Sequence, residues 1–248
     1  MTSISDAETR TDAYLGGRVR VRQGARGYRA GVDAVMLAAA VPAEPGETVL
    51  ELGCGVGVAA LCLAARVPGL EVTGVELHPE SAGLARENGL QVVTADLRDL
   101  PPEVKSRRYD HVMMNPPYFD RRAGKASPHA ARDLAHGGDT ALADWLEAGT
   151  RRLAPGGRLT LIQRIARLPE VLGALRPGTV RVRPLVARQG READRFLLTA
   201  RQGGRGAFRL LPPFVLHAGP MHLGDEDDDY TAETRAILRD GAAFPWGD

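Results

Sequence analysis

The chain has 248 residues, of which 44% are hydrophobic and 25% are charged, and its formal net charge is +1. This length supports one sizeable hydrophobic core, and the composition excludes a disordered or fibrous protein. The sequence has no run of about 18 apolar residues that could cross a membrane, and its two cysteines, Cys54 and Cys62, are too few for a disulfide framework.

The predicted elements begin with a half-exposed strand over 18–23 and a helix over 32–41. Strands and helices then alternate, with strands over 48–52, 71–76, 91–95, 109–114 and 158–163 and helices over 58–66, 79–88, 142–153 and 168–175. Such alternation predicts a parallel sheet with helices on both faces. The last two strands, near 180–186 and 195–200, are joined by a segment too short for a crossover helix, so we expect an antiparallel hairpin at the sheet edge.

A glycine cluster follows the strand over 48–52. In open α/β sheets the ligand lies beyond the carboxyl ends of the strands, and the first strand-to-helix turn usually contacts it. Gly53, Gly55 and Gly57 lie in that turn, where a sharp bend and a close ligand leave no room for Cβ atoms. A glycine triplet alone is compatible with several nucleotide-like ligands.

Three acidic residues at successive strand ends indicate which ligand binds. Glu51 precedes the turn, where a carboxylate would repel a dinucleotide pyrophosphate but attract a cofactor with an ammonium and a sulfonium. Glu76 closes the next strand, beside Leu77, and can accept hydrogen bonds from both hydroxyls of a ribose. Asp96 follows the third strand and can accept from an adenine amino group while Leu97 packs on the ring.

Other interpretations of these residues exist. Glu76 and Asp96 could simply cap the helices that follow them. Together with Glu51 and the glycine turn, however, they favour a methionine-type cofactor, and a nicotinamide dehydrogenase is the second interpretation. The six histidines show no paired spacing and no G-x-S-x-G motif occurs, so we expect neither a metal site nor a serine hydrolase. Cys54 is expected to be a small, buried residue.

A second motif, Asn115-Pro116-Pro117-Tyr118, follows the strand over 109–114. The amino nitrogen of adenine, like an amide nitrogen, shares its lone pair with a neighbouring π system and is a poor nucleophile. The Asn115 side-chain carbonyl and the Pro116 main-chain carbonyl could accept hydrogen bonds from the two N–H groups of this nitrogen. They would thereby direct its lone pair at a sulfonium methyl. The prolines would hold these acceptors rigid and Tyr118 would stack on the base, although an isolated Asn-Pro-Pro can also be only a turn.

With these motifs the chain resembles the class I S-adenosylmethionine-dependent N-methyltransferases that carry an NPPY motif and act on adenine N6 or on a glutamine amide. From about Leu15 to about His217 it is similar to bacterial tRNA(Val) adenine N6-methyltransferases. The similar pieces are Gln23, Gly27-Tyr28-Arg29, Asp33-Ala34-Val35, the turn over 51–57, Glu76, the segment 115–119 and the segment 153–157.

The resemblance implies an α/β fold with the Rossmann-like, seven-stranded class I methyltransferase sheet, mostly parallel with an antiparallel edge hairpin. It also implies S-adenosyl-L-methionine as the cofactor and a segment around Arg29 and Asp33 that closes over the methionine end of that cofactor. We therefore expect methylation of the exocyclic N6 of an adenine in RNA, foremost in tRNA. N5-methylation of a glutamine amide in a protein and a noncatalytic RNA-binding protein of the same fold are the alternatives.

On this basis we divide the chain into three segments. Residues 1–45 form an N-terminal appendage whose basic strand and short helix would cover the cofactor, 46–217 form the methyltransferase domain, and 218–248 form an acidic C-terminal tail. We expect the run DEDDD at 225–229 to be solvated. Arginines gather in 16–32 and 176–209, and Arg121, Arg122, Lys125 and Arg132 follow the NPPY motif; these groups would contact RNA phosphates or simply form a solvated basic face. RNA is thus the expected partner, with no membrane, no metal and a cytoplasmic location.

Overall fold

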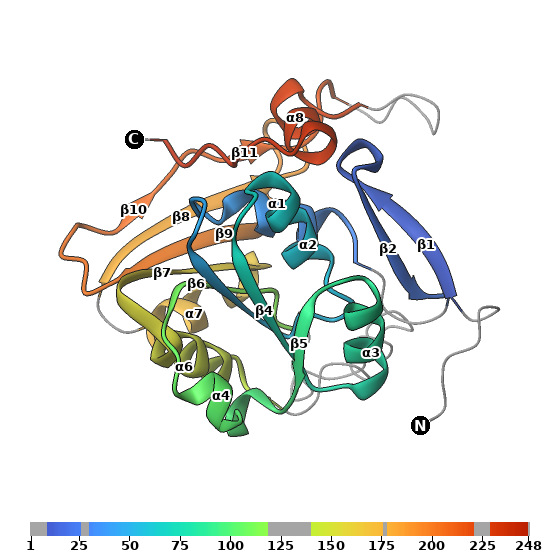
Figure 1. Cartoon of the computed structure of the whole chain (residues 1–248). Helices are drawn as coiled ribbons and strands as arrows, with labels where there is room; N and C mark the ends of the chain where they lie inside the picture. The colour runs from blue at the N-terminus through green and yellow to red at the C-terminus, as the bar shows by residue number, and fades with distance from the viewer. Residues whose placement is uncertain (1–8, 26–29, 119–139, 176–177, 221–228, 248) are drawn as a thin grey trace, which may run out of the picture.

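The structure, a computed structural model, describes residues 9–25, 30–118, 140–175, 178–220 and 229–247. These residues form a nine-stranded sheet with helices on both faces and a separate two-stranded hairpin (Figure 1). The strands are β1 (Thr9–Tyr14), β2 (Val19–Gly24), β3 (Thr48–Leu52), β4 (Glu71–Glu76), β5 (Gln91–Thr94), β6 (Tyr109–Met114), β7 (Leu153–Arg164), β8 (Gly178–Val186), β9 (Ala193–Gln202), β10 (Arg209–Leu210) and β11 (Phe214–Val215). The α-helices are α1 (Val32–Ala40), α2 (Val58–Arg66), α3 (Pro79–Glu87), α4 (Pro102–Lys105), α6 (Leu142–Arg152), α7 (Leu168–Ala174) and α8 (Ala232–Asp240), and the 3₁₀ helices are η2 (Leu15–Gly17), η3 (Leu97–Asp99) and η5 (Ile165–Arg167).

The large sheet has the strand order β10-β8-β9-β7-β6-β3-β4-β5, and β11 also pairs with β8. The strands from β3 to β7 pair in parallel, whereas β9 is antiparallel to both β7 and β8. The predicted mostly parallel sheet and its antiparallel hairpin are thereby confirmed. We expect this hairpin at the edge of the sheet, but it is not outermost. The two-residue strands β10 and β11 pair with the outer side of β8.

The strand order reverses between β3 and β6. The chain runs outward from β3 through β4 to β5 and then returns to place β6 on the other side of β3. Leu52 and Met114, the last residues of these two strands, are direct partners in the sheet. The glycine turn and the NPPY motif therefore leave the sheet side by side, at the position where open α/β sheets bind their ligands.

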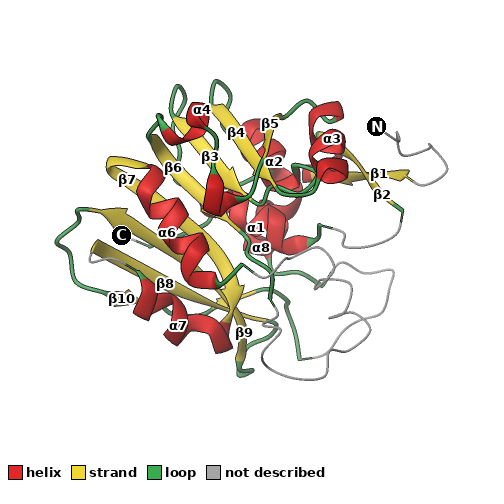
Figure 2. Ribbon diagram, turned by 90° about the horizontal axis from the view of Figure 1, so that it is seen from below, coloured by secondary structure: helices red, strands yellow, loops and turns green. Residues whose placement is uncertain are grey.

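Two layers of helices cover the sheet (Figures 1 and 2). Helices α1, α2, α3 and α8 contribute to one hydrophobic cluster, and α4, α6 and α7 contribute to the other. Strand β3 supplies both layers, because successive side chains of a strand point to opposite faces: Val49 belongs to the first cluster and Leu50 to the second. This double covering is why four successive residues of β3, 49–52, are buried, instead of every second one.

The N-terminal hairpin is held to the body of the protein by a cap on α3. Asn88 accepts a hydrogen bond from the Arg22 amide at 2.8 Å and donates to the Arg22 and Val56 carbonyls at 3.0 Å each. Val19 and Val21 of β2 are buried in the same cluster as α1. The strand β1, which pairs along all of β2, was not predicted from the sequence.

The C-terminal segment packs on α1. Helix α8 contacts α1, and Ile237 and Phe244 are buried. Phe244 donates its amide to the Ala39 carbonyl at 2.9 Å, and the Trp246 indole donates to the Ala40 carbonyl at 2.8 Å. Two carbonyls at the end of α1, which have no partner inside the helix, are satisfied in this way. The described residues beyond 229 in the segment predicted as an acidic tail, 218–248, therefore pack on the body of the protein.

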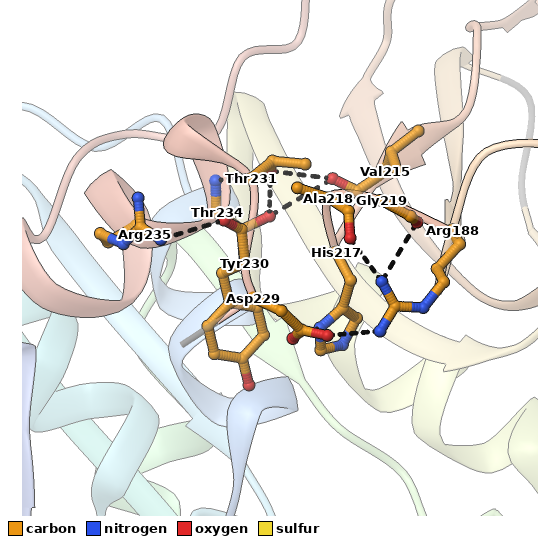
Figure 3. A network of polar contacts seen from close by, with 10 residues as sticks. All are labelled: Arg188, Val215, His217, Ala218, Gly219, Asp229, Tyr230, Thr231, Thr234 and Arg235. Atoms are coloured by element: carbon orange, nitrogen blue, oxygen red, sulfur yellow. Dashed lines mark hydrogen bonds and ion pairs between the residues drawn. The ribbon is translucent and has the colours of Figure 1, made fainter. Parts of the chain in front are cut away.

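Asp229 is the described member of the acidic run, and it is buried instead of solvated (Figure 3). It forms an ion pair with Arg188, and the His217 ring contacts its carboxylate at 2.6 Å. The His217 ring also stacks on Tyr230 with 4.7 Å between ring centroids. The expectation of a solvated Asp229 is wrong because the arginine that follows β8 reaches it; residues 225–228 lie outside the described residues. The boundaries at 45/46 and 217/218 stay a prediction.

No helix among the described ranges combines the length and the apolar character needed to cross a membrane.

Candidate functional site

One pocket lies at the reversal of strand order, beyond the carboxyl ends of β3, β4, β5 and β6. Its lining combines the glycine turn, the acids at the strand ends and the NPPY motif. The predicted site residues that line it are Glu51, Gly53, Gly55, Glu76, Leu77, Asp96, Leu97, Asn115, Pro116, Pro117 and Tyr118. The structure thus brings together residues of two motifs that lie far apart in the sequence.

The three glycines of the turn all have a positive φ, of 67° at Gly53, 57° at Gly55 and 93° at Gly57. This conformation is strained for other residues. A Cβ on Gly53 would also lie 2.4 Å from the Trp145 ring, and one on Gly57 would lie 3.1 Å from Leu90. At Gly55, by contrast, no described atom lies within 4 Å of the Cβ position. Gly55 is therefore the residue of the three that leaves open space at the pocket, whereas Gly53 and Gly57 are needed for packing.

Cys54 packs beneath the turn. A Cβ on Gly74 of β4 would lie 2.6 Å from the Cys54 sulfur, so the thiol fills the space above that glycine. Burial raises the pKa of the Cys54 thiol well above its ordinary value, and the charges of Glu51 and Glu76 raise it further. The thiol therefore stays neutral, and Cys54 is the small buried residue that the sequence predicts.

Glu76 organises the glycine turn. One carboxylate oxygen accepts the Gly55 amide at 2.8 Å, and the other accepts the His78 amide at 2.9 Å. The side chain is 7% exposed and lines the pocket. Each carboxylate oxygen retains a further acceptor site, so a ribose contact is compatible with these bonds. Sequence reasoning did not foresee that Glu76 also holds the turn in place.

Glu51 is buried between β3 and α2, and it accepts the Ala60 amide at 3.0 Å. Burial raises the pKa of Glu51 to about 8, and the nearby negative charge of Glu76 acts in the same direction. An ionised carboxylate is costly in such a place unless a cation is close. A positively charged ligand in this pocket would compensate that cost.

Asp96 both lines the pocket and caps η3. It accepts the Arg98 amide at 2.9 Å and pairs with the Arg98 side chain at 2.6 Å, and these hydrogen bonds hold the pKa of Asp96 below its ordinary value. Its interpretation as a cap is therefore correct, and its position in the pocket keeps the adenine contact possible. Leu97 is buried at the pocket wall, whereas Leu77 is 40% exposed.

These residues fit S-adenosylmethionine. The open space at Gly55, the buried acid Glu51 and the carboxylates at the ends of β4 and β5 suit a ligand with a cationic end, a ribose and an adenine. Leu97, next to Asp96, would give the adenine an apolar surface.

The NPPY motif faces this site from β6. Asn115 is half-buried and Pro116 is buried, and both line the pocket. The Pro116 carbonyl accepts a hydrogen bond from the Gln163 side chain of β7 at 3.1 Å. Since a carbonyl oxygen has two lone pairs, this bond leaves one acceptor site for a substrate.

Tyr118 is held by residues from two distant elements. Its hydroxyl donates to Asp33 of α1, and Arg195 of β9 pairs with the same carboxylate. The Arg164 guanidinium lies 5.3 Å from the centre of the Tyr118 ring. One side of the ring is thus in contact with a cation, a favourable arrangement for an aromatic face.

The predicted role of Asp33 at the cofactor stays a prediction. Asp33 is not among the described residues that line the pocket; its carboxylate is engaged by Tyr118 and Arg195. The neighbouring Ala30 and Ala34 line the pocket instead. Arg29, the other residue predicted in this segment, lies outside the described residues, as do Arg121, Arg122, Lys125 and Arg132.

Sequence reasoning missed the structural role of Gln23. Its side chain is 1% exposed and lines the pocket. It donates to the Tyr14 hydroxyl at 2.7 Å and to Asp12 at 2.8 Å, and it accepts the Ala30 amide at 3.1 Å. Gln23 therefore connects the N-terminal hairpin to the segment before α1. Gln23 lies on the same face of β2 as Val19 and Val21, and this alternation was the signal for its burial.

Comparisons with known proteins identify the family of the chain. The family model described as methyltransferase small domain matches residues 30–175. The tRNA1(Val) (adenine(37)-N6)-methyltransferase of Aeromonas hydrophila is 34% identical over 71% of this chain and 77% of its own length, and that of Dickeya chrysanthemi is 30% identical over 86% and 87%.

A solved structure supports the fold. A protein from Agrobacterium tumefaciens described as a predicted O-methyltransferase superposes with a TM-score of 0.68 at 26% identity, covering 86% of this chain and 98% of its own. The family model spans more than half of the chain, and the relatives match it over most of their length. The chain therefore belongs to the methyltransferase small domain family and is an S-adenosylmethionine-dependent methyltransferase.

Proposed function

We propose that this enzyme methylates the exocyclic N6 of an adenine in tRNA, and that the adenine at position 37 of a valine tRNA is its substrate. The observation that carries the proposal is that the glycine turn and the NPPY motif line the same pocket. The glycine turn begins after Leu52 and the motif after Met114, and these two residues are partners in the sheet. The names of the relatives from Aeromonas and Dickeya support the choice of acceptor.

The cofactor side of the pocket would bind S-adenosylmethionine. Glu76 would accept the ribose hydroxyls, and Asp96 with Leu97 would hold the adenine. Glu51 would lie toward the cationic part of the ligand, where a positive charge stabilises its ionised form. When bound, the cofactor supplies a methyl group on a positively charged sulfur.

The acceptor side would orient the adenine. The Asn115 side-chain oxygen and the remaining lone pair of the Pro116 carbonyl accept hydrogen bonds from the two N–H groups of the amino group. The nitrogen lone pair is then directed toward the methyl group, and the two oxygens stabilise the positive charge that develops on nitrogen. The Tyr118 ring supports the base by stacking.

Base access and location follow from this substrate. An adenine must leave its base stack to enter this pocket. The free-energy cost of leaving the stack is smallest for an unpaired or loop nucleotide. RNA is thus the proposed partner, with the cytoplasm as the proposed location.

Incubation with labelled S-adenosylmethionine tests the proposal. Separated tRNA, rRNA and protein fractions are offered to the full-length enzyme and to Asn115→Ala. We expect label in the tRNA fraction, and only with the wild-type enzyme. Label in protein alone would support methylation of a glutamine amide instead, and absence of label from every fraction would support a noncatalytic role.

A further inference from the structure

Gln163 is a fully buried polar residue at the end of β7. Its exposed fraction is 0%, and its partner in β9 is Phe196, which is also buried. Burying a side-chain amide is unfavourable unless both of its ends find hydrogen-bond partners. The two partners of Gln163 therefore indicate why a polar residue lies in this apolar layer.

Both ends of the amide are engaged. The nitrogen donates to the Pro116 carbonyl at 3.1 Å, and the oxygen accepts the Arg164 main-chain amide at 2.8 Å. A main-chain N–H can only donate, so this second bond determines which end of the amide is oxygen. The nitrogen must consequently face Pro116.

Among the described residues, Gln163 is the side chain that donates to this carbonyl. Pro116 and Pro117 have no N–H, so neither can donate to a neighbouring strand. Beyond Met114 the motif leaves the β6–β7 ladder, whose last registered pair is Met114 with Leu161. Beyond the end of the ladder, the Gln163 side chain of β7 supplies the donor to the Pro116 carbonyl.

We infer that Gln163 is a positioning residue for methyl transfer: it holds the Pro116 carbonyl so that the remaining lone pair points at the substrate amino group. The inference rests on the proposed function for the identity of that amino group. Gln163 itself does not touch the substrate. Its loss should therefore lower kcat and leave the KM for S-adenosylmethionine unchanged.

Two variants and a matched control test this role in the full-length enzyme. Gln163→Leu removes the donor, and Gln163→Glu keeps the shape. Burial would raise the pKa of a carboxyl here above its ordinary value, so Gln163→Glu donates an O–H at low pH and presents a repelling carboxylate at high pH. Thr160→Val is the control, because Thr160 lies on the same strand with 0% exposure and its hydroxyl has no hydrogen-bond partner among the described residues.

Methyl transfer to unmodified tRNA is measured from about pH 6 to about pH 9 at saturating cofactor. We expect Gln163→Leu to lose about 10- to 100-fold in kcat at every pH. Gln163→Glu should stay within a few-fold of the wild type at the acid end and fall at least tenfold further as pH rises, relative to the wild type at each pH. Thr160→Val should match the wild type.

Wild-type kcat in Gln163→Leu, or a pH profile of Gln163→Glu parallel to that of the wild type, would overturn the inference. If Gln163→Leu fails to fold, as judged by circular dichroism and by cofactor binding, the Gln163→Glu profile decides. If the wild type methylates another acceptor, the proposed function fails, and the same comparison on that acceptor still tests Gln163.

Discussion

The two sides of the pocket are built in different ways. On the cofactor side, the two buried carboxylates contact the backbone of the glycine turn and of the helix that follows it: Glu76 accepts the Gly55 amide, and Glu51 accepts the Ala60 amide. On the acceptor side, the contacts join distant elements, since α1 and β9 hold Tyr118 and β7 holds the Pro116 carbonyl. Backbone amides and carboxylates make the first side, whereas the second depends on side chains.

This difference separates the binding of the cofactor from the orientation of the acceptor base. The cofactor side can keep its shape from local turn geometry, because the positive-φ glycines and the capping carboxylates lie close together in the sheet. The acceptor side is held by tertiary contacts, so substitutions far from the motif should change the acceptor geometry without changing cofactor affinity. Variants on the two sides should therefore affect different kinetic constants.

The largest effect is expected from Asn115→Ala on the acceptor side. Loss of one of two acceptors for the amino group should lower kcat by about 100- to 1000-fold. The dissociation constant of S-adenosylmethionine, measured by calorimetry, should stay within about twofold. A variant with weakened cofactor binding but normal turnover would break the comparison.

Glu76→Ala on the cofactor side should have the opposite pattern. A carboxylate that holds the turn and accepts ribose hydroxyls contributes about 1.5–3 kcal/mol per charged hydrogen bond, so affinity should fall about 10- to 100-fold. Turnover at saturating cofactor should recover most of its wild-type value. Glu76→Gln, which keeps an acceptor, is the matched control; equal affinity in Glu76→Ala and the wild type would contradict the assignment.

The pH dependence of stability should identify Glu51. Its pKa of about 8 in the folded protein exceeds its unfolded value of 4.5, so the folded state binds the proton more strongly. Stability is therefore highest below about pH 4.5 with respect to this group and declines as pH rises through about 8. Urea unfolding should show a loss on the order of 1–3 kcal/mol that Glu51→Gln lacks.

Saturating S-adenosylmethionine should sharpen this result. A cation beside Glu51 lowers the pKa of its carboxyl, so the bound protein should lose less stability between about pH 5 and about pH 8 than the free protein. An identical pH dependence with and without the cofactor would show that the cationic end lies elsewhere.

The smallest effect is expected from Asp33→Asn and Tyr118→Phe. Each removes part of the link between the Tyr118 hydroxyl and Asp33 but keeps the ring. A loss of about 1 kcal/mol in orientation corresponds to a fall in kcat of about fivefold. The affinity for S-adenosylmethionine separates the two roles of Asp33: it stays unchanged if Asp33 orients Tyr118 and weakens in Asp33→Asn if Asp33 binds the cofactor.

The cofactor side could be predicted well from the sequence, because its signals are local. The strands over 48–52, 71–76 and 109–114 agree with β3, β4 and β6 to the residue, and the glycine turn follows directly. The need for glycine at Gly53 was partly misread: its packing against Trp145 comes from α6, which a local pattern does not show.

The acceptor side could be predicted only as far as the NPPY motif itself. Gln163 reads as one polar residue at the end of a strand, and Asp33 as an acid in the first turn of a helix. Their contacts with Pro116 and Tyr118 depend on strand order and helix packing, which no spacing in the sequence specifies. The same reason explains Asp229, whose burial depends on Arg188.

We propose above all that this pocket directs an adenine N6 at the methyl group of the cofactor. This proposal is tested most directly by mass spectrometry of nucleosides and fragments from an unmodified valine tRNA after incubation with the enzyme and S-adenosylmethionine. We expect one N6-methyladenosine, at position 37, and none with Asn115→Ala. A methyl group on a ring nitrogen, on a ribose oxygen or on a different nucleotide would contradict it.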